Sequence, residues 1–317
     1  MGSNKDKAII RLLREAFGGV ELFIKILFKK YDFFLFSSPN FLTAFIGALA
    51  CVLTRRKFIL DIRDIYPHVF FYSGLIKENS LPAKILMSFT NFIYNRASFI
   101  SVVTDGLREI VQNNTQTEVV VVRNGYSHTS EKVQVKKSAF KCLFHGTFGV
   151  FQDIDSLKLV IERVFELDPS IEFHLYGDGP KISLLDQIES KSCTLYGHTD
   201  HTTLQEVIPS HDIGLSFRVE NEISRDAFPV KVYEYIGANI PIISTPKNCD
   251  VASFIHKFSI GYNFDNNETE KISQMILDLK NNQAKVNSIK ENIQKSKDQF
   301  SRVSQAQKLL KKLNSKL

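Results

Sequence analysis

The sequence predicts an α/β protein with two doubly wound domains, in which helices cover both faces of a parallel sheet. Three observations predict this class. Short apolar runs alternate with segments of helical spacing in both halves of the chain. A polar stretch without periodicity, 126–138, separates the two series and is typical of a linker. The length of 317 residues also suits two domains of about 100–200 residues each.

In the first half, apolar runs rich in Phe, Ile and Val have the length of buried strands. We expect strands at 33–36, 57–62, 99–103 and 118–123, and helices at 8–15, 20–30, 41–53, 83–96 and 105–112. The glycines Gly18 and Gly19 separate the first two helices. The uncharged stretch 33–53 has the length of a membrane span, but the segment 37–40 divides it into pieces too short to cross a bilayer.

The alternation restarts at Phe140 and predicts a second doubly wound domain. We expect strands at 140–145, 172–176, 193–196, 212–217 and 241–244, helices at 154–167, 182–189, 204–208 and 229–238, and only helices after them. The domains would therefore comprise residues 1–128 and 129–317. We expect the last helix, 300–315, to pack back on the first domain.

Charge and cysteine usage narrow the classes of partner. The net charge of +6 favours anionic partners, although it also fits an ordinary soluble surface. Basic residues are not interleaved with aromatic residues in one patch, which argues against nucleic acid. The four cysteines form no CxxC pair, so we expect neither a zinc site nor a disulfide framework. Reduced cysteines are typical of the cytosol, so we expect a cytoplasmic protein. The basic helices at 8–30 could rest on anionic lipid or be ordinary surface and core helices.

The most informative stretch runs from Asp226 to Glu234. Pro229 suits the first position of a helix, so the amides of residues 230–232 would point out of its N-terminus and could bind phosphate. Glu234, one turn further on, could reach a ribose diol, and Asp226 could accept hydrogen bonds from sugar hydroxyls. Alternatively, Asp226 caps the helix and Glu234 is solvated.

Two carboxylates separated by seven residues, with a helix beginning between them, resemble the E-x7-E motif of glycosyltransferase family 4. That family has the GT-B fold, in which two Rossmann-like domains face a cleft. Four segments of the second half resemble its donor domain: 228–244, 144–149, 175–180 and 195–197. In the first half, Leu60–Pro67 resembles the "DVRDLWP" signature of bacterial O-antigen and capsule transferases, which use UDP-linked N-acetylamino sugars. Arg123-Asn124-Gly125 resembles the end of the family's first domain.

The resemblance implies a role for each matching residue. Glu234 would hold the ribose and Asp226 the sugar hydroxyls, while Lys231 and Arg225 would be the cations nearest to the leaving diphosphate. The remaining donor contacts would come from Val230 and Val232 at the diphosphate, Gly146, Thr147 and Gly149 at the distal phosphate, Tyr196 and Gly197 at the base, and His145 in the same cleft.

In the first domain, Arg63 and Asp64 would face the cleft as catalytic residues. Arg63 can stabilise phosphate charge but cannot act as a general base. His68 lies close by in the sequence and could titrate or simply pack. We expect no metal and no cofactor, because no acidic pair follows a strand of the second domain.

The chain also departs from the family's pattern. Asp226 replaces the usual glutamate, and no cation follows the glycine loop in the segment 148–152. The family's opening strand is not found, so the first domain is expected to be incomplete.

The resemblance implies a retaining glycosyltransferase that moves a hexosyl or N-acetylhexosaminyl group from a UDP-linked nucleoside-diphosphate donor to a polyprenyl-diphosphate-linked saccharide. Its products would belong to O-antigen, lipopolysaccharide or capsule, made at the inner face of the cytoplasmic membrane. Two alternatives stay open: a non-catalytic relative that binds nucleotide sugar or serves as a subunit, and a sugar-nucleotide epimerase, which shares the GT-B architecture.

Overall fold

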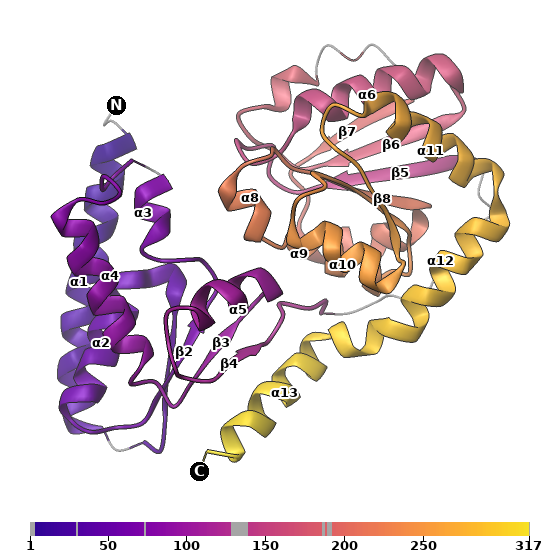
Figure 1. The fold of residues 1–317 in the computed structure, drawn as a ribbon. Helices are drawn as coiled ribbons and strands as arrows, with labels where there is room; N and C mark the ends of the chain where they lie inside the picture. Colours follow the sequence, from indigo (N-terminus) through magenta and orange to yellow (C-terminus); the bar gives the residue numbers. More distant parts are fainter. Residues whose placement is uncertain are drawn as a thin grey trace. The chain divides into compact units, whose positions relative to one another are not determined.

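The computed structural model describes residues 4–29, 31–72, 74–127, 139–185, 188 and 192–316. The chain forms two compact units, one of Met1–Arg123 with Gln307–Leu317 and one of Asn124–Ala306. Each unit is an α/β fold with its own parallel sheet (Figure 1). Most of the linker expected at 126–138 lies outside the described residues. No helix in the described part of the chain is both long and apolar enough to span a membrane.

The first unit contains a four-stranded parallel sheet of order β1-β2-β3-β4. Its elements are α1 (Asn4–Phe28), β1 (Phe34–Ser37), η1 (Ser38–Asn40), α2 (Phe41–Leu53), β2 (Phe58–Ile62), α3 (His68–Tyr72), α4 (Leu81–Tyr94), β3 (Phe99–Val102), α5 (Asp105–Gln112) and β4 (Val119–Val121). Every side chain of β2 and β3 is buried, as expected for the central strands of a covered parallel sheet. The predicted strands and helices from 33 onward agree with these bounds to within two residues, but α3 was not predicted.

The two N-terminal helices predicted around Gly18 and Gly19 are wrong, because α1 runs through both glycines as one helix. A Cβ on Gly19 would lie 2.7 Å from Cδ1 of Ile46, so the missing side chain lets α2 approach closely. On the same face, the buried carboxylate of Glu15 accepts a hydrogen bond of 3.2 Å from the amide of Leu42, near the start of α2. Close helix packing therefore outweighs the low helix propensity of glycine.

The second unit contains a six-stranded parallel sheet of order β10-β9-β8-β5-β6-β7. Its first elements are β5 (Phe140–His145), α6 (Ile154–Leu167), β6 (Ile171–Tyr176), η2 (Ile182–Leu184), β7 (Cys193–Gly197), α7 (His201–Val207), η3 (Ile208–Ser210), β8 (Ile213–Phe217) and α8 (Glu222–Asp226). They are followed by α9 (Val230–Gly237), β9 (Ile242–Thr245), α10 (Asp250–Phe258), β10 (Gly261–Asn263), α11 (Thr269–Asn281), α12 (Gln283–Ser296), η4 (Lys297–Phe300) and α13 (Arg302–Asn314). Helices α6 and α11 cover one face of the sheet and α9 and α10 the other (Figure 1).

Two predictions for the second unit need correction. The region after β9 is not purely helical, because β10 pairs in parallel with β9 at the edge of the sheet. A strand of three residues is too short to show a period in the sequence. The helix predicted at 182–189 is only a 3₁₀ turn in its described part, η2, and residues 186, 187 and 189 lie outside the described residues.

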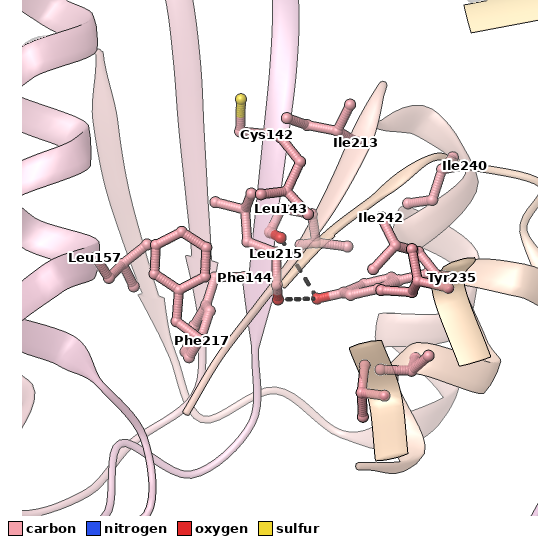
Figure 2. Packing of buried hydrophobic residues seen from close by; sticks show 14 of the residues in the cluster. Cys142, Leu143, Phe144, Leu157, Ile213, Leu215, Phe217, Tyr235, Ile240 and Ile242 are labelled. Atoms are coloured by element: carbon pink, nitrogen blue, oxygen red, sulfur yellow. Dashed lines mark hydrogen bonds between the residues drawn. The ribbon is translucent and has the colours of Figure 1, made fainter. Parts of the chain in front are cut away.

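Tyr235 fixes α9 against the sheet. A Cβ on Gly214 of β8 would lie 2.4 Å from the Tyr235 ring, so only glycine leaves room for it. The Tyr235 hydroxyl donates to the carbonyl of Leu215 at 3.0 Å and to that of Leu143 at 3.4 Å, across neighbouring strands (Figure 2). Burial raises the pKa of Tyr235 well above its usual value, so the hydroxyl stays protonated as a donor. This anchor sets the position of the residues at the start of α9.

The last helix, α13, begins in the second unit and ends in the first. In the first unit, Lys312 and Lys316 form ion pairs with Glu118, just before β4. Glu118 is half-exposed, so these pairs contribute little to stability individually.

Candidate functional site

The loops after β5 and β6 interlock through glycines. The amide of Gly146 donates to the carbonyl of Tyr176 at 2.9 Å, and the amide of Gly177 donates to that of Gly197 at 2.7 Å. A Cβ on Gly177 would lie 1.9 Å from the Gly146 carbonyl oxygen, and both glycines have a positive φ. The loop of Gly146, Thr147 and Gly149 is thus built from backbone at the carboxyl end of the sheet, where ligands of such folds bind.

Helix α9 begins with its N-terminus toward the same end of the sheet, but it offers fewer amides than the sequence predicts. Pro229 is the N-cap, not the first helical residue. The amide of Val232 donates to the Pro229 carbonyl at 3.2 Å, and Val232 is fully buried. The expectation that Val232 presents a free amide is therefore wrong. The amides of Val230 and Lys231 remain at the N-terminus for an anion.

Lys231 is a buried cation next to the glycine loop. A Cβ on Gly146 would lie 3.6 Å from its Nζ, which also donates to Oε1 of Gln152 at 3.2 Å. The Nζ lies 3.9 Å from the centre of the Phe144 ring. Burial, and then the nearby Arg218 guanidinium, lower the pKa of Lys231 to about 7. An anion bound at this point would favour the charged form.

Arg218 supplies a second, partly buried cation directly after β8. Burial lowers its pKa, and its Nε has no hydrogen-bond partner among the described residues. The residues Gln152 and Arg218 form an antiparallel bridge, which ties the segment after the glycine loop to the end of β8. The cation that the segment 148–152 lacks in the sequence is thus replaced in space by Lys231 and Arg218.

Glu234 is buried between two histidines, so the alternative of a solvated Glu234 is wrong. Its Oε1 lies 3.1 Å from Nε2 of His201 at the start of α7, within hydrogen-bond geometry. Its Oε2 lies 3.3 Å from Nε2 of His145 at the end of β5, but that nitrogen has no hydrogen bond in the described part of the chain. Burial lowers the pKa of His145 well below its usual value, so His145 is neutral.

An aromatic platform lies at the ends of β6 and β7. The rings of Tyr176 and Tyr196 stack with their centres 4.3 Å apart and an angle of 3° between their planes. Tyr196 is half-exposed, and Gly197 follows it with a φ of 68°. A flat, partly exposed ring suits the face of a planar base.

Asp226 is the last residue of the short helix α8. Oδ1 of Asp226 lies 3.3 Å from Nε of Arg225, whose side chain is half-exposed. Asp226 does not cap α9, because the cap residue is Pro229 and no side chain bonds there. The alternative of a helix cap is therefore wrong.

In the first unit, Arg63 and Asp64 follow β2 in a loop held by Ser38. The Ser38 hydroxyl accepts hydrogen bonds from the amides of Arg63 at 2.8 Å and Asp64 at 3.2 Å. Nε of Arg63 donates to Asp61 at 2.8 Å, and Asp61 is buried and also accepts from the Ser101 hydroxyl at 2.9 Å. Burial raises the pKa of Asp64. His68 begins α3 and packs against the rings of Phe71 and Tyr72.

The family comparison decides the class of this protein. Residues 127–296 match the family of "Glycosyl transferases group 1", and this match spans more than half of the chain. The chain belongs to the group 1 glycosyl transferases. The matched region of this glycosyltransferase lies within its second unit, which also contains Glu234 and Lys231.

Known relatives agree with this assignment. "Probable glycosyltransferase WbjE" from Pseudomonas aeruginosa is 20% identical over 298 residues, which cover 86% of this chain and 73% of the relative. The structure of Anabaena HepE in complex with UDP-glucose has a TM-score of 0.67 at 15% identity, over 90% of this chain and 79% of HepE. WaaG, a glycosyltransferase involved in lipopolysaccharide biosynthesis, has a TM-score of 0.57 at 14% identity, over 80% of this chain and 76% of WaaG. The predicted GT-B fold is confirmed.

In the structure of this glycosyltransferase, some of the predicted site residues contact one another, and further residues lie beside them. Gly146, Lys231, His145 and Glu234 are linked by the contacts given above, whereas Asp226 and Arg225 contact each other. Sequence reasoning missed His201 and Arg218. Each follows a strand of the second unit within a few residues, so a systematic survey of every strand's carboxyl end could have found both.

Proposed function

We propose that this glycosyltransferase moves a hexosyl or N-acetylhexosaminyl group from a UDP-linked donor to a polyprenyl-diphosphate-linked saccharide, with retention of configuration, in surface-polysaccharide synthesis. The observation that carries the proposal is Lys231, a buried cation placed between the glycine loop and the α9 N-terminus. A lysine buried this way is costly unless an anion joins it. The UDP-glucose in HepE and the lipopolysaccharide role of WaaG support the choice of donor and product.

The donor's parts have matching groups in the second unit. The diphosphate would take the amides of Val230 and Lys231, the Lys231 ammonium and the backbone of the loop 146–149. The ribose diol would bind Glu234, and the base would lie by Tyr196 and Gly197. Asp226 would accept hydrogen bonds from the sugar, with Arg225 beside it.

The reaction breaks the bond between the anomeric carbon and the diphosphate oxygen, and forms a bond between that carbon and an acceptor oxygen on the same face. The acceptor's hydroxyl proton leaves with the released diphosphate or passes to a nearby carboxylate. Charge on the leaving diphosphate is neutralised by fixed amides and Lys231, which is effective in a water-poor site. In the first unit, Arg63 would stabilise phosphate charge, and Asp64, whose pKa is raised, suits proton uptake.

A lipid-linked acceptor requires a membrane surface, and α1 offers a face for it. Seven large apolar side chains recur on this helix every three or four residues and are 44–80% exposed: Ile10, Leu13, Phe17, Val20, Ile24, Leu27 and Phe28. The exposed bases Arg14, Lys25 and Lys29 flank them. An apolar stripe edged with basic residues is typical of helices that lie on anionic bilayers.

The test is a transfer assay with UDP-glucose and UDP-N-acetylglucosamine and a synthetic polyprenyl-diphosphate-linked saccharide. Asp226→Asn should lower kcat at least tenfold, about 1.4 kcal/mol in barrier, and leave UDP affinity unchanged, because sugar contacts tighten in the transition state. Asp226→Glu, which introduces the family's residue, should keep or raise activity.

Glu222→Gln, which changes an exposed carboxylate of the same helix, is the matched control and should behave as wild type. An inverted product, read by the anomeric coupling in NMR, would contradict retention. If wild type binds UDP-sugars, transfers none of them and is not rescued by Asp226→Glu, the chain is a non-catalytic relative.

A further inference from the structure

The buried Glu234 carboxylate lies beside one strongly exposed side chain among the contacts described above, that of His201. The groups around its carboxylate on β5 and α9, namely His145, Lys231 and Tyr235, are all buried. His201 on α7 differs, because its side chain is 54% exposed while it donates to Oε1 of Glu234. The hydrogen bond to His201 therefore joins the buried carboxylate to an exposed side chain that a ligand from solvent can displace.

The His201 side chain stands on a rigid backbone. Asp200 caps α7, with Oδ1 accepting from the amides of Thr202 and Thr203 at 3.0 Å each. The Gln205 amide nitrogen, one turn further on, lies 3.3 Å from His201 Nε2. Rotation of an exposed side chain takes far less time than a backbone rearrangement. His201 can thus leave Glu234 without unwinding α7.

The second side of Glu234 also points to a ligand. His145 is 95% buried at its side chain, its Nε2 is 3.3 Å from Oε2, and this nitrogen has no hydrogen-bond partner among the described residues. A buried polar atom without a partner is costly, so a hydroxyl that reaches Oε2 and Nε2 together would satisfy both. His201 bonds to one oxygen of the carboxylate, and the other oxygen faces the unpartnered Nε2 of His145.

We infer that His201 is the gate of the ribose subsite: its imidazole takes the place of a ribose hydroxyl on Glu234 and gives way when the diol binds. This inference rests on the proposed function, in which Glu234 holds the ribose. His201 is then a specificity-determining residue. A nucleotide with ribose hydroxyls can replace the hydrogen bond between His201 and Glu234. A nucleotide without these hydroxyls binds while His201 stays on Glu234.

The test compares UDP with its 2′,3′-dideoxy analogue by calorimetry on the full chain. His201→Ala should bind UDP roughly fivefold tighter, equivalent to about 1 kcal/mol, because the competing hydrogen bond is gone. Affinity for the dideoxy analogue should not change. His201→Gln, which keeps an N–H donor at a similar reach, should restore wild-type values. His256→Ala, a change at an exposed histidine of α10, is the matched control.

Each other outcome is decisive. If His201→Ala weakens UDP more than the dideoxy analogue, His201 assists the ribose and the gate is wrong. If it weakens both ligands equally, its role is structural and the gate is again wrong. Glu234→Ala tests the underlying site: it should erase the preference for UDP over the analogue. An unchanged preference in Glu234→Ala would remove Glu234 from the ribose subsite, which overturns the donor placement as well as the gate.

Discussion

Lys231 is where stability and function oppose each other most directly. Its ammonium is buried with the Gln152 amide oxygen and the Phe144 ring close by, and burial lowers its pKa, so its charged form is costly in the folded protein. Keeping this proposed diphosphate-binding cation inside the protein therefore lowers the free energy of unfolding. Such conflicts are expected at functional sites.

The pKa of Lys231 gives this conflict a pH window. Its pKa of about 7 in the folded protein lies below the ordinary lysine value of 10.5. Between these values the unfolded chain binds the proton and the folded chain does not, so the free energy of unfolding rises with pH across this window. Below pH 7 both states bind the proton and the full destabilisation remains.

Lys231→Met should therefore raise the free energy of unfolding near neutral pH, on the order of a few kcal/mol. The free energy of unfolding of this variant should also increase less between neutral pH and about pH 10 than that of wild type. It should also weaken UDP binding at least tenfold, since a charge-assisted contact is lost. Urea unfolding at about pH 6 and about pH 9 measures the first effect. Lys271→Met, at an exposed lysine, is the control. A variant that is less stable at both pH values and binds UDP normally would make Lys231 a purely structural residue.

At the scale of elements, α9 and β8 act as one unit. All residues of α9 after Val230 are buried, although the helix carries both Lys231 and Glu234. The Tyr235 ring over Gly214 sets its depth, and the two hydroxyl hydrogen bonds set its rotation. A shift of this helix would move Lys231 and Glu234, the proposed phosphate and ribose contacts, together.

Gly214→Ala should destabilise the protein by roughly 1–3 kcal/mol, because the new methyl group overlaps the Tyr235 ring. It should also lower UDP affinity without changing any residue of the proposed donor site. Gly18→Ala is a useful comparison, since its Cβ would meet Thr43 at an ordinary 3.6 Å and alanine favours helix. Thermal unfolding and calorimetry report the two effects. Wild-type UDP affinity in a destabilised Gly214→Ala variant would show that α9 does not transmit the overlap to the site.

Local sequence patterns predicted helices and strands well where tertiary packing did not change their bounds. The bounds of α2, β5 and α6 agree with the sequence, because long apolar periods with clear flanking turns leave little choice. The single helix α1 and the edge strand β10 could not be predicted. The first depends on Ile46 packing against Gly19, and the second on pairing with β9.

At the scale of the whole molecule, the exposed face of α1 predicts association with lipid. Phe17→Asp with Ile24→Asp should abolish co-flotation with vesicles that contain anionic phospholipid and leave UDP affinity unchanged, because both side chains lie on the apolar stripe. Val303→Asp, which changes an exposed apolar residue of α13, is the control. If wild type does not float with these vesicles but elutes as a dimer that the double variant dissociates, the stripe is an interface between copies.

The sequence by itself determined the alternation of strands and helices, the two domains' class and the carboxylate-helix pattern of the donor site, because these depend on neighbours along the chain. Tertiary structure decided which loops meet. The order β8-β5-β6 brings Gly146 to Lys231, and β5 and α7 bring two histidines to Glu234. Strand order is a long-range property with no local period, and burial of a charge depends on every element packed around it. Several residues of the candidate site could therefore be proposed from the sequence, but their burial, charge states and partners could not.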